Sequence, residues 1–447
     1  MSLKSDNQRI SFSSVKNRMH YPDFLEVQLK SFQDFFQLDT TAENRKNEGL
    51  YKVFMENFPI TDTRNNFVLE FIDYYIDPPR YSIDECLERG LTYSVPLKAK
   101  LKLYCTDPEH EDFDTVIQDV YFGTIPYMTP RGTFVINGAE RAIVSQLVRS
   151  PGVFYGDAKD KVGNDLYSAT MNPNRGAWLE YETDAANVFY VRIDKNRKLP
   201  VTVLCRALGL STNEDILNFF GDDERILATL EKDTTKNQEE GLLEVYRKLR
   251  PGEPPTVESA TSQINMLFFD PRRYDLSRFG RYKMNKKLSL ARRITGFVAA
   301  ENIVAPLTGE VIVEANGKIS RELAEKADNA GVDTVVLLIE GKKVKVITNG
   351  CVDAQGFFSF DVKECGINER CSFDEIKKIL DTTSDVEEQK EMLRRNHDQL
   401  IGRTVTVKDI LSSINYLNGL GHGVGTTDDI DHLGNRRIRS VGELLQN

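Results

Sequence analysis

A short acidic segment near the end of the sequence contains residue types that can bind a metal ion. Its potential ligands are Asp428, Asp429, Asp431 and His432. Carboxylate oxygens and an imidazole nitrogen suit divalent cations, so this segment could serve a metal-dependent enzyme. The segment 436–439, however, brings three arginines that would compete for the same carboxylates. Judged on the residues alone, an ion-paired turn is the better interpretation, and a stand-alone metal enzyme remains an alternative.

Two further residues are of types that bind nucleic acids. Arg149 precedes the segment 150–152 (Ser-Pro-Gly), where an extended backbone passes into a turn. A guanidinium at such a strand end can hold a phosphate or a base edge with two hydrogen bonds. Trp178, the only tryptophan, begins a predicted strand and could stack on an unpaired base. Without further information, a strand-end ion pair and a core anchor are the simpler interpretations.

The segment 272–293 is strongly basic, with nine lysines and arginines and a single acidic residue, Asp275. The net charge of the whole chain is −10, which argues against a protein that binds nucleic acid over its entire surface. A local basic surface is nevertheless compatible with a negative net charge of the whole chain. The segment could contact a phosphate backbone, or it could be a solvated helix face or a surface for an acidic partner. A protein-interaction scaffold without DNA contact is therefore a second alternative.

Length and composition limit the class of protein. With 447 residues, the chain is longer than one hydrophobic core usually serves, so we expect two or three domains. No apolar run is long enough to span a bilayer, and the polar start lacks the apolar region of a secretory signal. The six cysteines are scattered without the close pairs typical of zinc sites. We therefore expect reduced thiols, no membrane contact and a cytoplasmic location.

The hydrophobic pattern predicts an α+β protein with mixed or antiparallel sheets and packed helices. The segment 94–105 alternates apolar and polar residues, as a half-buried antiparallel strand does. Asn137-Gly138 predicts the turn of a hairpin over 133–147, and 178–183 with 188–194 predicts another. Helical periodicity is found over 23–36, 211–220, 241–249, 257–269, 387–400, 407–418 and 439–447.

The order of these elements suggests an inserted module. Over 295–402 the pattern changes to short strands and turns around a helix at 320–329, and we expect a small α/β module with its own core. The last predicted helix stops at Asn447 without a C-cap, so we expect the chain to be a fragment of a longer protein.

Several long segments, in the same order along the chain, resemble the β subunit of bacterial DNA-directed RNA polymerase. Residues 122–156 read FGTIPYMTPRGTFVINGAERAIVSQLVRSPGVFYG, and residues 428–446 read DDIDHLGNRRIRSVGELLQ. Shorter matches lie at 22–36, 176–182, 250–255 and 273–287. The resemblance thus covers nearly the whole chain, and it is far more specific than one short motif.

The resemblance implies a non-catalytic N-terminal part of that subunit. Residues 1–145 would form most of a protrusion domain, to which 436–447 return, and 146–435 would form a lobe domain carrying the module 295–402. This part would wall the main DNA channel and contact non-template and downstream DNA. Its partners would be the remainder of β, the β′, α and σ subunits, and DNA. The fragment would hold no cofactor and be inactive alone, since the catalytic magnesium belongs to β′.

The resemblance also implies roles for individual residues. Arg149 would face the downstream end of the transcription bubble, and Trp178 would face the non-template strand. Asp431 and Arg436 would form a pocket for a flipped-out non-template guanine. Three more residues would border part of a rifamycin site, most of which comes from sequence beyond Asn447: Arg141, Val144 and Gln146.

Overall fold

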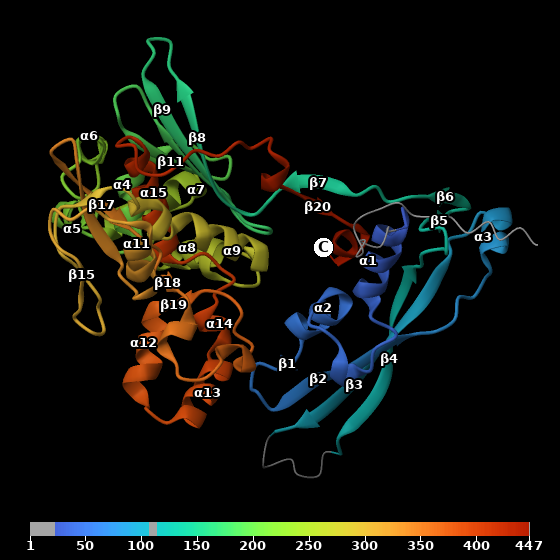
Figure 1. The fold of residues 1–447 in the computed structure, drawn as a ribbon. Helices are drawn as coiled ribbons and strands as arrows, with labels where there is room; N and C mark the ends of the chain where they lie inside the picture. The colour runs from blue at the N-terminus through green and yellow to red at the C-terminus, as the bar shows by residue number, and fades with distance from the viewer. Residues whose placement is uncertain (1–22, 107–113, 447) are drawn as a thin grey trace, which may run out of the picture. The chain divides into compact units, whose positions relative to one another are not determined.

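The computed structural model describes residues 23–106 and 114–446 (Figure 1). The chain divides into two compact units, residues 1–148 with 438–447, and residues 149–437. Both units combine helices with strands, and the strands of the main sheet of each unit pair antiparallel. The predicted α+β fold class is confirmed. Whether the units correspond to the protrusion and lobe domains of the resembled family stays a prediction.

The first unit is built on a four-stranded sheet in the order β1-β2-β3-β4. Its strands are β1 (Ile60–Thr61), β2 (Phe67–Ile76), β3 (Ser94–Cys105) and β4 (Val116–Pro126). The core between the sheet and its helices is rich in aromatic rings; Phe54 and Phe71, for example, stack with centroids 4.6 Å apart. The predicted strand 94–105 is confirmed as β3. The helices of this unit are α1 (Glu26–Phe36), α2 (Gly49–Asn57), α3 (Ile83–Arg89) and α16 (Val441–Gln446).

The Asn137-Gly138 turn forms as predicted, but its second strand is shorter than expected. Both turn residues have positive φ, 52° and 77°, between β5 (Phe134–Ile136) and β6 (Ala139–Arg141). A Cβ on Gly138 would lie 2.6 Å from the Cα of Gly90, so the turn requires glycine. The chain then forms β7 (Gln146–Arg149), which pairs with β20 (Arg436–Arg439). The predicted final helix therefore begins only at Val441.

The second unit contains a five-stranded antiparallel sheet in the order β12-β11-β10-β9-β8. The strands are β8 (Gly152–Lys159), β9 (Asp165–Asn172), β10 (Leu179–Thr183), β11 (Phe189–Ile193) and β12 (Leu199–Pro200). The hairpin predicted at 178–194 is confirmed as β10 and β11, with Leu179 opposite Ile193. Buried side chains alternate along both strands, because one face of the sheet packs on helices.

The helices that share a core with this sheet come from two distant stretches of chain. They are α4 (Val201–Ala207), α5 (Asn213–Phe220), α6 (Glu224–Lys232), α7 (Gln238–Leu249), α8 (Val257–Ile264), α9 (Ser277–Leu288) and α15 (Val407–Leu420). The predicted helix 257–269 changes to π-helical geometry after Ile264. Within the described residues, no helix is long and apolar enough to cross a membrane.

The segment predicted as one inserted module contains two separate hydrophobic cores. The first joins the sheet β13-β16-β17 to helix α11 (Arg321–Asn329) and the pair β14-β15. Its strands are β13 (Val298–Ala299), β14 (Ile303–Val304), β15 (Val311–Val313), β16 (Thr334–Ile339) and β17 (Lys342–Ile347). Helix α10 (Ala291–Ile294) contributes Ile294 to this core.

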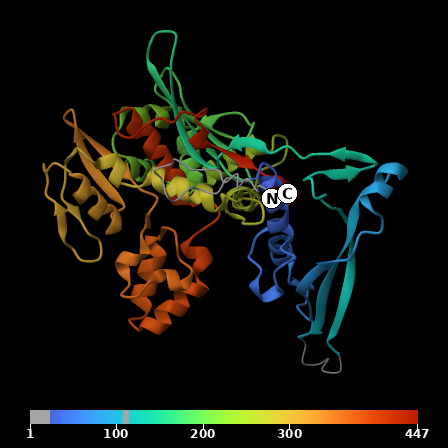
Figure 2. The same ribbon diagram turned by 45° about the vertical axis from the view of Figure 1, so that its right-hand side comes forward.

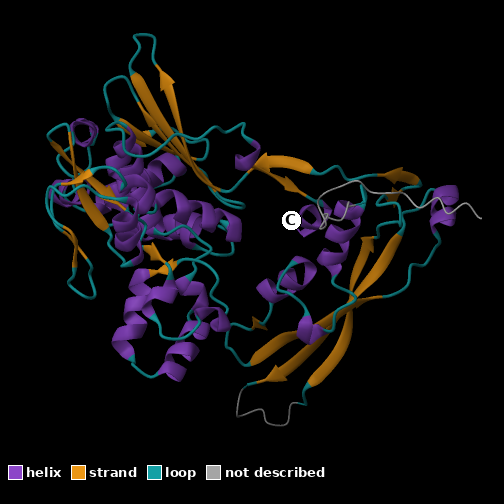
Figure 3. Cartoon of the chain, viewed as in Figure 1, coloured by secondary structure: helices purple, strands orange, loops and turns teal. Residues whose placement is uncertain are grey.

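The second core lies among three helices and one short strand pair. These elements are β18 (Cys351–Val352), β19 (Cys371–Ser372), α12 (Phe373–Thr382), α13 (Val386–Arg395) and α14 (His397–Leu400). Figures 1 and 2 both show α12–α14 as a cluster of their own, and Figure 3 shows that it is almost entirely helical. The helix predicted over 387–400 is therefore two helices, separated at Asn396.

A buried ion pair joins α9 to α15 at the centre of the second unit. Nη1 of Arg281 lies 2.7 Å from Oδ2 of Asp409, and the two side chains are 4% and 0% exposed. Arg281 also donates to the carbonyls of Gly402 (2.8 Å) and Thr404. Asp409 in turn accepts from Nδ2 of Asn349 at 2.9 Å and forms the capping box of α15. The ion pair thus holds α9 against α15. The further hydrogen bonds of its two side chains hold Asn349, which follows the first inserted core, and the segment 402–404, which follows the second.

We expect Asp409→Ala to lower the free energy of unfolding of the second unit by about 3–5 kcal/mol, because Arg281 would keep a buried, unpaired charge. The substitution also removes the capping box, so Thr406→Ala is the matched control. That control loses the cap and one hydrogen bond to the carboxylate of Asp409, but it keeps the ion pair, so we expect a loss of about 1–2 kcal/mol. Urea unfolding followed by circular dichroism measures both variants. Equal losses in the two would mean that the ion pair is unimportant.

Candidate nucleic-acid interface

Arg149 and Trp178 lie side by side in the second unit. Cζ of Arg149 is 5.8 Å from the centre of the indole ring, within the range of a cation–π contact. Trp178 is 38% exposed and does not belong to the core. Arg149 forms no ion pair with any carboxylate in the described part of the chain. The simpler interpretations, a core anchor and a strand-end ion pair, are therefore both wrong.

The backbone around Trp178 explains why the indole stays exposed. The amide of Trp178 donates to Oδ1 of Asp194 at 2.7 Å, and its carbonyl accepts from the amide of Asp194 at 2.8 Å. Asp194 has a positive φ of 54° and turns the chain immediately after β11. Trp178 is thereby held just before the first residue of β10, on the exposed side of an alternation in which its neighbours Ala177 and Leu179 are buried.

The acidic segment near the end of the chain is held against strand β8. Asp428 donates its amide to the carbonyl of Tyr155 at 2.7 Å, and its Oδ2 accepts from the amide of Tyr155 at 3.0 Å. The other carboxylate oxygen lies 2.7 Å from Nζ of Lys287 on α9. Tyr155 itself is fully buried and stacks on Tyr416, with ring centroids 4.2 Å apart. Asp428 therefore anchors the segment to the core.

A second lysine of α9 fixes the segment a few residues later. Nζ of Lys283 donates to the carbonyl of Gly434 at 2.7 Å and to Oδ1 of Asn435 at 3.1 Å. Burial lowers the pKa of Lys283 from its usual value, and the carboxylate of Asp428 opposes this shift only in part. The carbonyl of Asn435 accepts from the amide of Ser150 at 3.0 Å. Arg149 precedes Ser150 in the chain and Arg436 follows Asn435, so this hydrogen bond brings the backbones of the two arginines close together.

Asp431 and Arg436 project from this anchored segment and are both exposed. The amide of Asp431 donates to Oδ1 of Asp429 at 2.9 Å, which shapes the turn. Within residues 23–106 and 114–446, neither Asp431 nor Arg436 has an ion-pair partner. The predicted ion-paired turn is therefore wrong, because only Asp428 is paired and its partner lies on α9. His432 accepts from the amide of Gly434 at 3.0 Å.

The described residues contain no group of three or more His, Cys, Asp or Glu side chains that could hold a metal ion. The six cysteines are free thiols. Sequence reasoning grouped the acidic residues by their proximity along the chain, whereas the fold turns Asp428 inward and Asp431 outward.

The basic segment has two different roles. Four of its cations are internal: Arg281 and Arg293 are buried, and Lys283 and Lys287 hold the acidic segment. Sequence reasoning missed these two lysines as structural residues. Their spacing of four on one helix was the available signal, since it places both side chains on one face.

The other five cations of the basic segment are exposed at the surface. Arg278 pairs with Glu369. The remaining cations of the segment are exposed and have no carboxylate partner in the described chain: Arg272, Arg273, Lys286 and Arg292.

The residues predicted to border a rifamycin site lie in the first unit. Arg141 ends β6 and Gln146 begins β7, and both are exposed. Val144, between the two strands, is 78% exposed. Their assignment to such a border stays a prediction.

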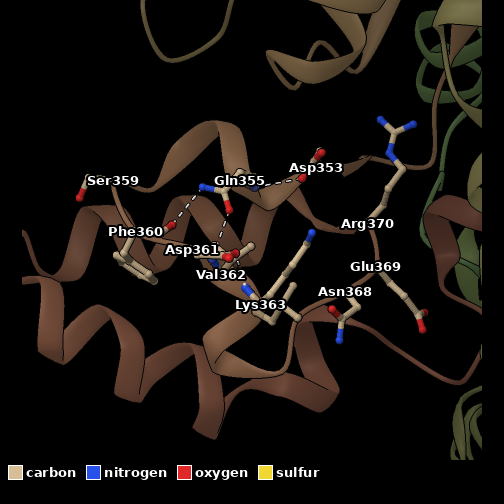
Figure 4. Close-up of a pocket in the computed structure, with 11 residues that line it drawn as sticks. Asp353, Gln355, Ser359, Phe360, Asp361, Val362, Lys363, Asn368, Glu369 and Arg370 are labelled. Atoms are coloured by element: carbon tan, nitrogen blue, oxygen red, sulfur yellow. Dashed lines mark hydrogen bonds between the residues drawn. The ribbon is translucent and has the colours of Figure 1, made fainter.

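A hollow of about 540 Å³ in the helical cluster is lined by residues 353–370 (Figure 4). Its polar groups largely bond to one another: Gln355 donates to the carbonyl of Phe360 at 3.0 Å and accepts from the amide of Val362 at 3.2 Å. Figure 4 shows Arg370 pointing away from Gln355. These bonds shape two short turns, and we assign no ligand to them.

The interface thus combines side chains that suit single-stranded nucleic acid. The partly buried Arg149 and the exposed Arg436 can donate to phosphates or base edges, and the partly exposed indole of Trp178 can stack on a base. The exposed carboxylate of Asp431 can accept from the ring and amino N–H groups that guanine presents.

Comparisons with known proteins identify the family of the chain. The family model "RNA polymerase Rpb2, domain 2" matches residues 149–302 and 340–439, and the model "RNA polymerase beta subunit" matches residues 23–131. Each curated relative named here is a DNA-directed RNA polymerase subunit beta. That of Acetivibrio thermocellus is 53% identical over 99% of the chain. Those of Clostridium botulinum (strain Eklund 17B / Type B) and Clostridioides difficile are 52% identical over 98%.

The chain spans about a third of the length of these relatives, 34% in each case. The family models nevertheless match most of it, and the domain 2 model alone covers more than half. The residues 303–339 that this model omits lie in the first of the two inserted cores. The chain therefore belongs to the family of RNA polymerase β subunits.

Proposed function

We propose that this chain is a non-catalytic, N-terminal part of an RNA polymerase β subunit that walls the main DNA channel and grips the non-template strand near the downstream fork. The observation that carries the proposal is the pairing of Arg149 with the half-exposed Trp178, next to an anchored segment that presents Asp431 and Arg436. All four side chains have free polar groups or a free ring face, and family membership supplies the nucleic acid as ligand.

Each residue has a distinct task in this proposal. Arg149 neutralises a backbone phosphate beside the ring of Trp178, and that ring stacks on an unpaired non-template base. Asp431 accepts two hydrogen bonds from a guanine that has left the stack, and Arg436 donates to its O6 or to a neighbouring phosphate. Lys283 and Lys287 are positioning residues, because they hold the segment from which Asp431 and Arg436 project.

The remaining parts of the reaction come from other polypeptides in this proposal. Nucleotidyl transfer requires carboxylates that hold magnesium at the end of the growing RNA. We assign that cluster to β′, and we assign promoter-directed synthesis to the assembly of this chain with the rest of β and with β′, α and σ. The assembly acts on DNA in the bacterial cytoplasm.

The proposal is tested first by reconstitution from a split subunit. The chain is mixed with a second polypeptide that begins after Asn447, together with α, β′ and σ, and promoter-directed RNA synthesis is measured. We expect synthesis only when the chain is present, and none from the chain with template and nucleotides alone. A folded chain that neither assembles nor alters synthesis would instead favour an interaction scaffold without DNA contact.

The stacking role of Trp178 is tested by binding of the chain to fluorescent forked DNA. We expect Trp178→Ala to weaken binding about tenfold, because a stacked base contributes about 1–3 kcal/mol. Trp178→Phe is the matched control and keeps most of the affinity, since it retains an aromatic face. Unchanged binding by the alanine variant would exclude stacking, and an equal loss in both variants would indicate a structural role.

The base preference of Asp431 is tested with two forked DNAs that differ in one unpaired base, guanine or adenine. We expect Asp431→Ala to reduce the preference for guanine about tenfold. Removal of a negative charge should at the same time leave adenine binding unchanged or slightly stronger. This opposite response separates base recognition from general electrostatics. Equal changes with both DNAs would contradict the guanine pocket.

A further inference from the structure

A cavity of about 560 Å³ lies between α9, α10 and the segment that follows α15. This volume is in the range of small-molecule sites and is far below what a stretch of duplex would need. The cavity belongs entirely to the second unit. It is lined by neither Trp178 nor Asp431, although it borders the lysines Lys283 and Lys287 that hold the segment of Asp431.

The lining of this cavity is strongly cationic. Its charged side chains are Lys283, Lys286, Lys287, Arg292, Arg293 and the single carboxylate of Asp428. That carboxylate is already paired with Lys287 at 2.7 Å. Lys283 donates only to neutral oxygens, those of Gly434 and Asn435. Most of the positive charge is therefore not neutralised by the protein.

Arg293 is the clearest sign of a missing anion. Its side chain is 2% exposed, yet it donates only to neutral groups, the carbonyl of Ile347 at 2.6 Å and Oδ1 of Asn415 at 2.9 Å. Its buried Nε has no hydrogen-bond partner among the described residues. Burial lowers the pKa of Arg293 to about 10, because no carboxylate compensates for its desolvation. A bound anion would stabilise this charge.

Two exposed cations stand at the cavity beside Arg293 and are not used by the fold. Lys286 and Arg292 have no carboxylate partner in the described chain, and Nζ of Lys286 lies 5.7 Å from the ring of Tyr282. Arg292 offers the planar fork that binds phosphate oxygens in pairs, and Lys286 offers a mobile point charge. Tyr282, Tyr416 and Phe297 add aromatic surface to the lining.

We propose that this cavity binds a small anion that carries one or two phosphate groups, held by Lys286 and Arg292 with Arg293 behind them. The occupant is a free phosphorylated compound, because a concave site of this volume suits a small ligand. The site is independent of the proposed function.

Isothermal titration of the full chain with inorganic pyrophosphate tests the site. The informative variant is Lys286→Met with Arg292→Gln, which leaves the buried Arg293 in place. Its matched control is Arg272→Met with Arg273→Gln, since those exposed cations belong to the same basic segment but do not line the cavity. We expect the first variant to lose about tenfold or more in affinity, as two charged hydrogen-bond donors are removed. The control should change less than about twofold.

Three outcomes would overturn the proposal. The chain could fail to bind pyrophosphate at millimolar concentration, or both double variants could lose the same pyrophosphate affinity. In the third outcome, Lys286→Met with Arg292→Gln weakens binding of duplex DNA but leaves pyrophosphate affinity unchanged. The last would assign the cations to a nucleic acid backbone. Trp178→Ala should leave pyrophosphate affinity unchanged, so failure of this site and failure of the proposed DNA grip are distinguishable. Replacement of pyrophosphate by inorganic phosphate or a nucleoside diphosphate identifies how much of the ligand is recognised.

Discussion

The buried ion pair between Arg281 and Asp409 is the constraint on which the second unit depends. It fixes helix α9 against α15 in a medium where neither charge could remain alone. Because α9 is held on this face, the positions of Lys283 and Lys287 along the same helix are also fixed. These two lysines carry the segment that ends in Arg436, so the buried pair supports the proposed interface without touching it.

The basic segment illustrates how one run of charges serves several purposes. Arg281 and Arg293 are buried, two lysines hold a neighbouring segment, and the remaining cations other than Arg278 are exposed and free of carboxylate partners in the described chain. A count of lysines and arginines therefore overstates the charge available to nucleic acid. Long-range attraction depends on the exposed, unpaired groups, since an internal pair has little field outside the protein.

The interface follows a similar division between fixed backbone and free side chains. Trp178 directly precedes strand β10, Asp431 lies in a turn, and Arg436 begins strand β20; hydrogen bonds hold the backbone at all three positions. Side chains on a backbone held in this way can meet a flexible single strand with little additional loss of backbone entropy on binding. The comparisons place the chain in the family of RNA polymerase β subunits, and contact with the non-template strand is part of the proposed function.

Local sequence patterns specify the fold class, strand β3, the turn at Asn137-Gly138 and the hairpin of β10 and β11. Each depends on alternation or turn chemistry within a short window, where neighbouring residues decide the backbone. Resemblance to the family was also visible in the sequence, since long ordered segments match.

The pairing of charges and the exposure of side chains depend, in contrast, on contacts between distant parts of the chain. The partner of Asp428 is Lys287, and that of Arg281 is Asp409, both more than a hundred residues away in the chain. Trp178 is free because Asp194, on the far side of the hairpin, holds its backbone. The inserted segment has two cores because its strands and its helices close around different apolar residues. Burial and ion pairing are properties of residues brought together in space, and local periodicity does not encode them.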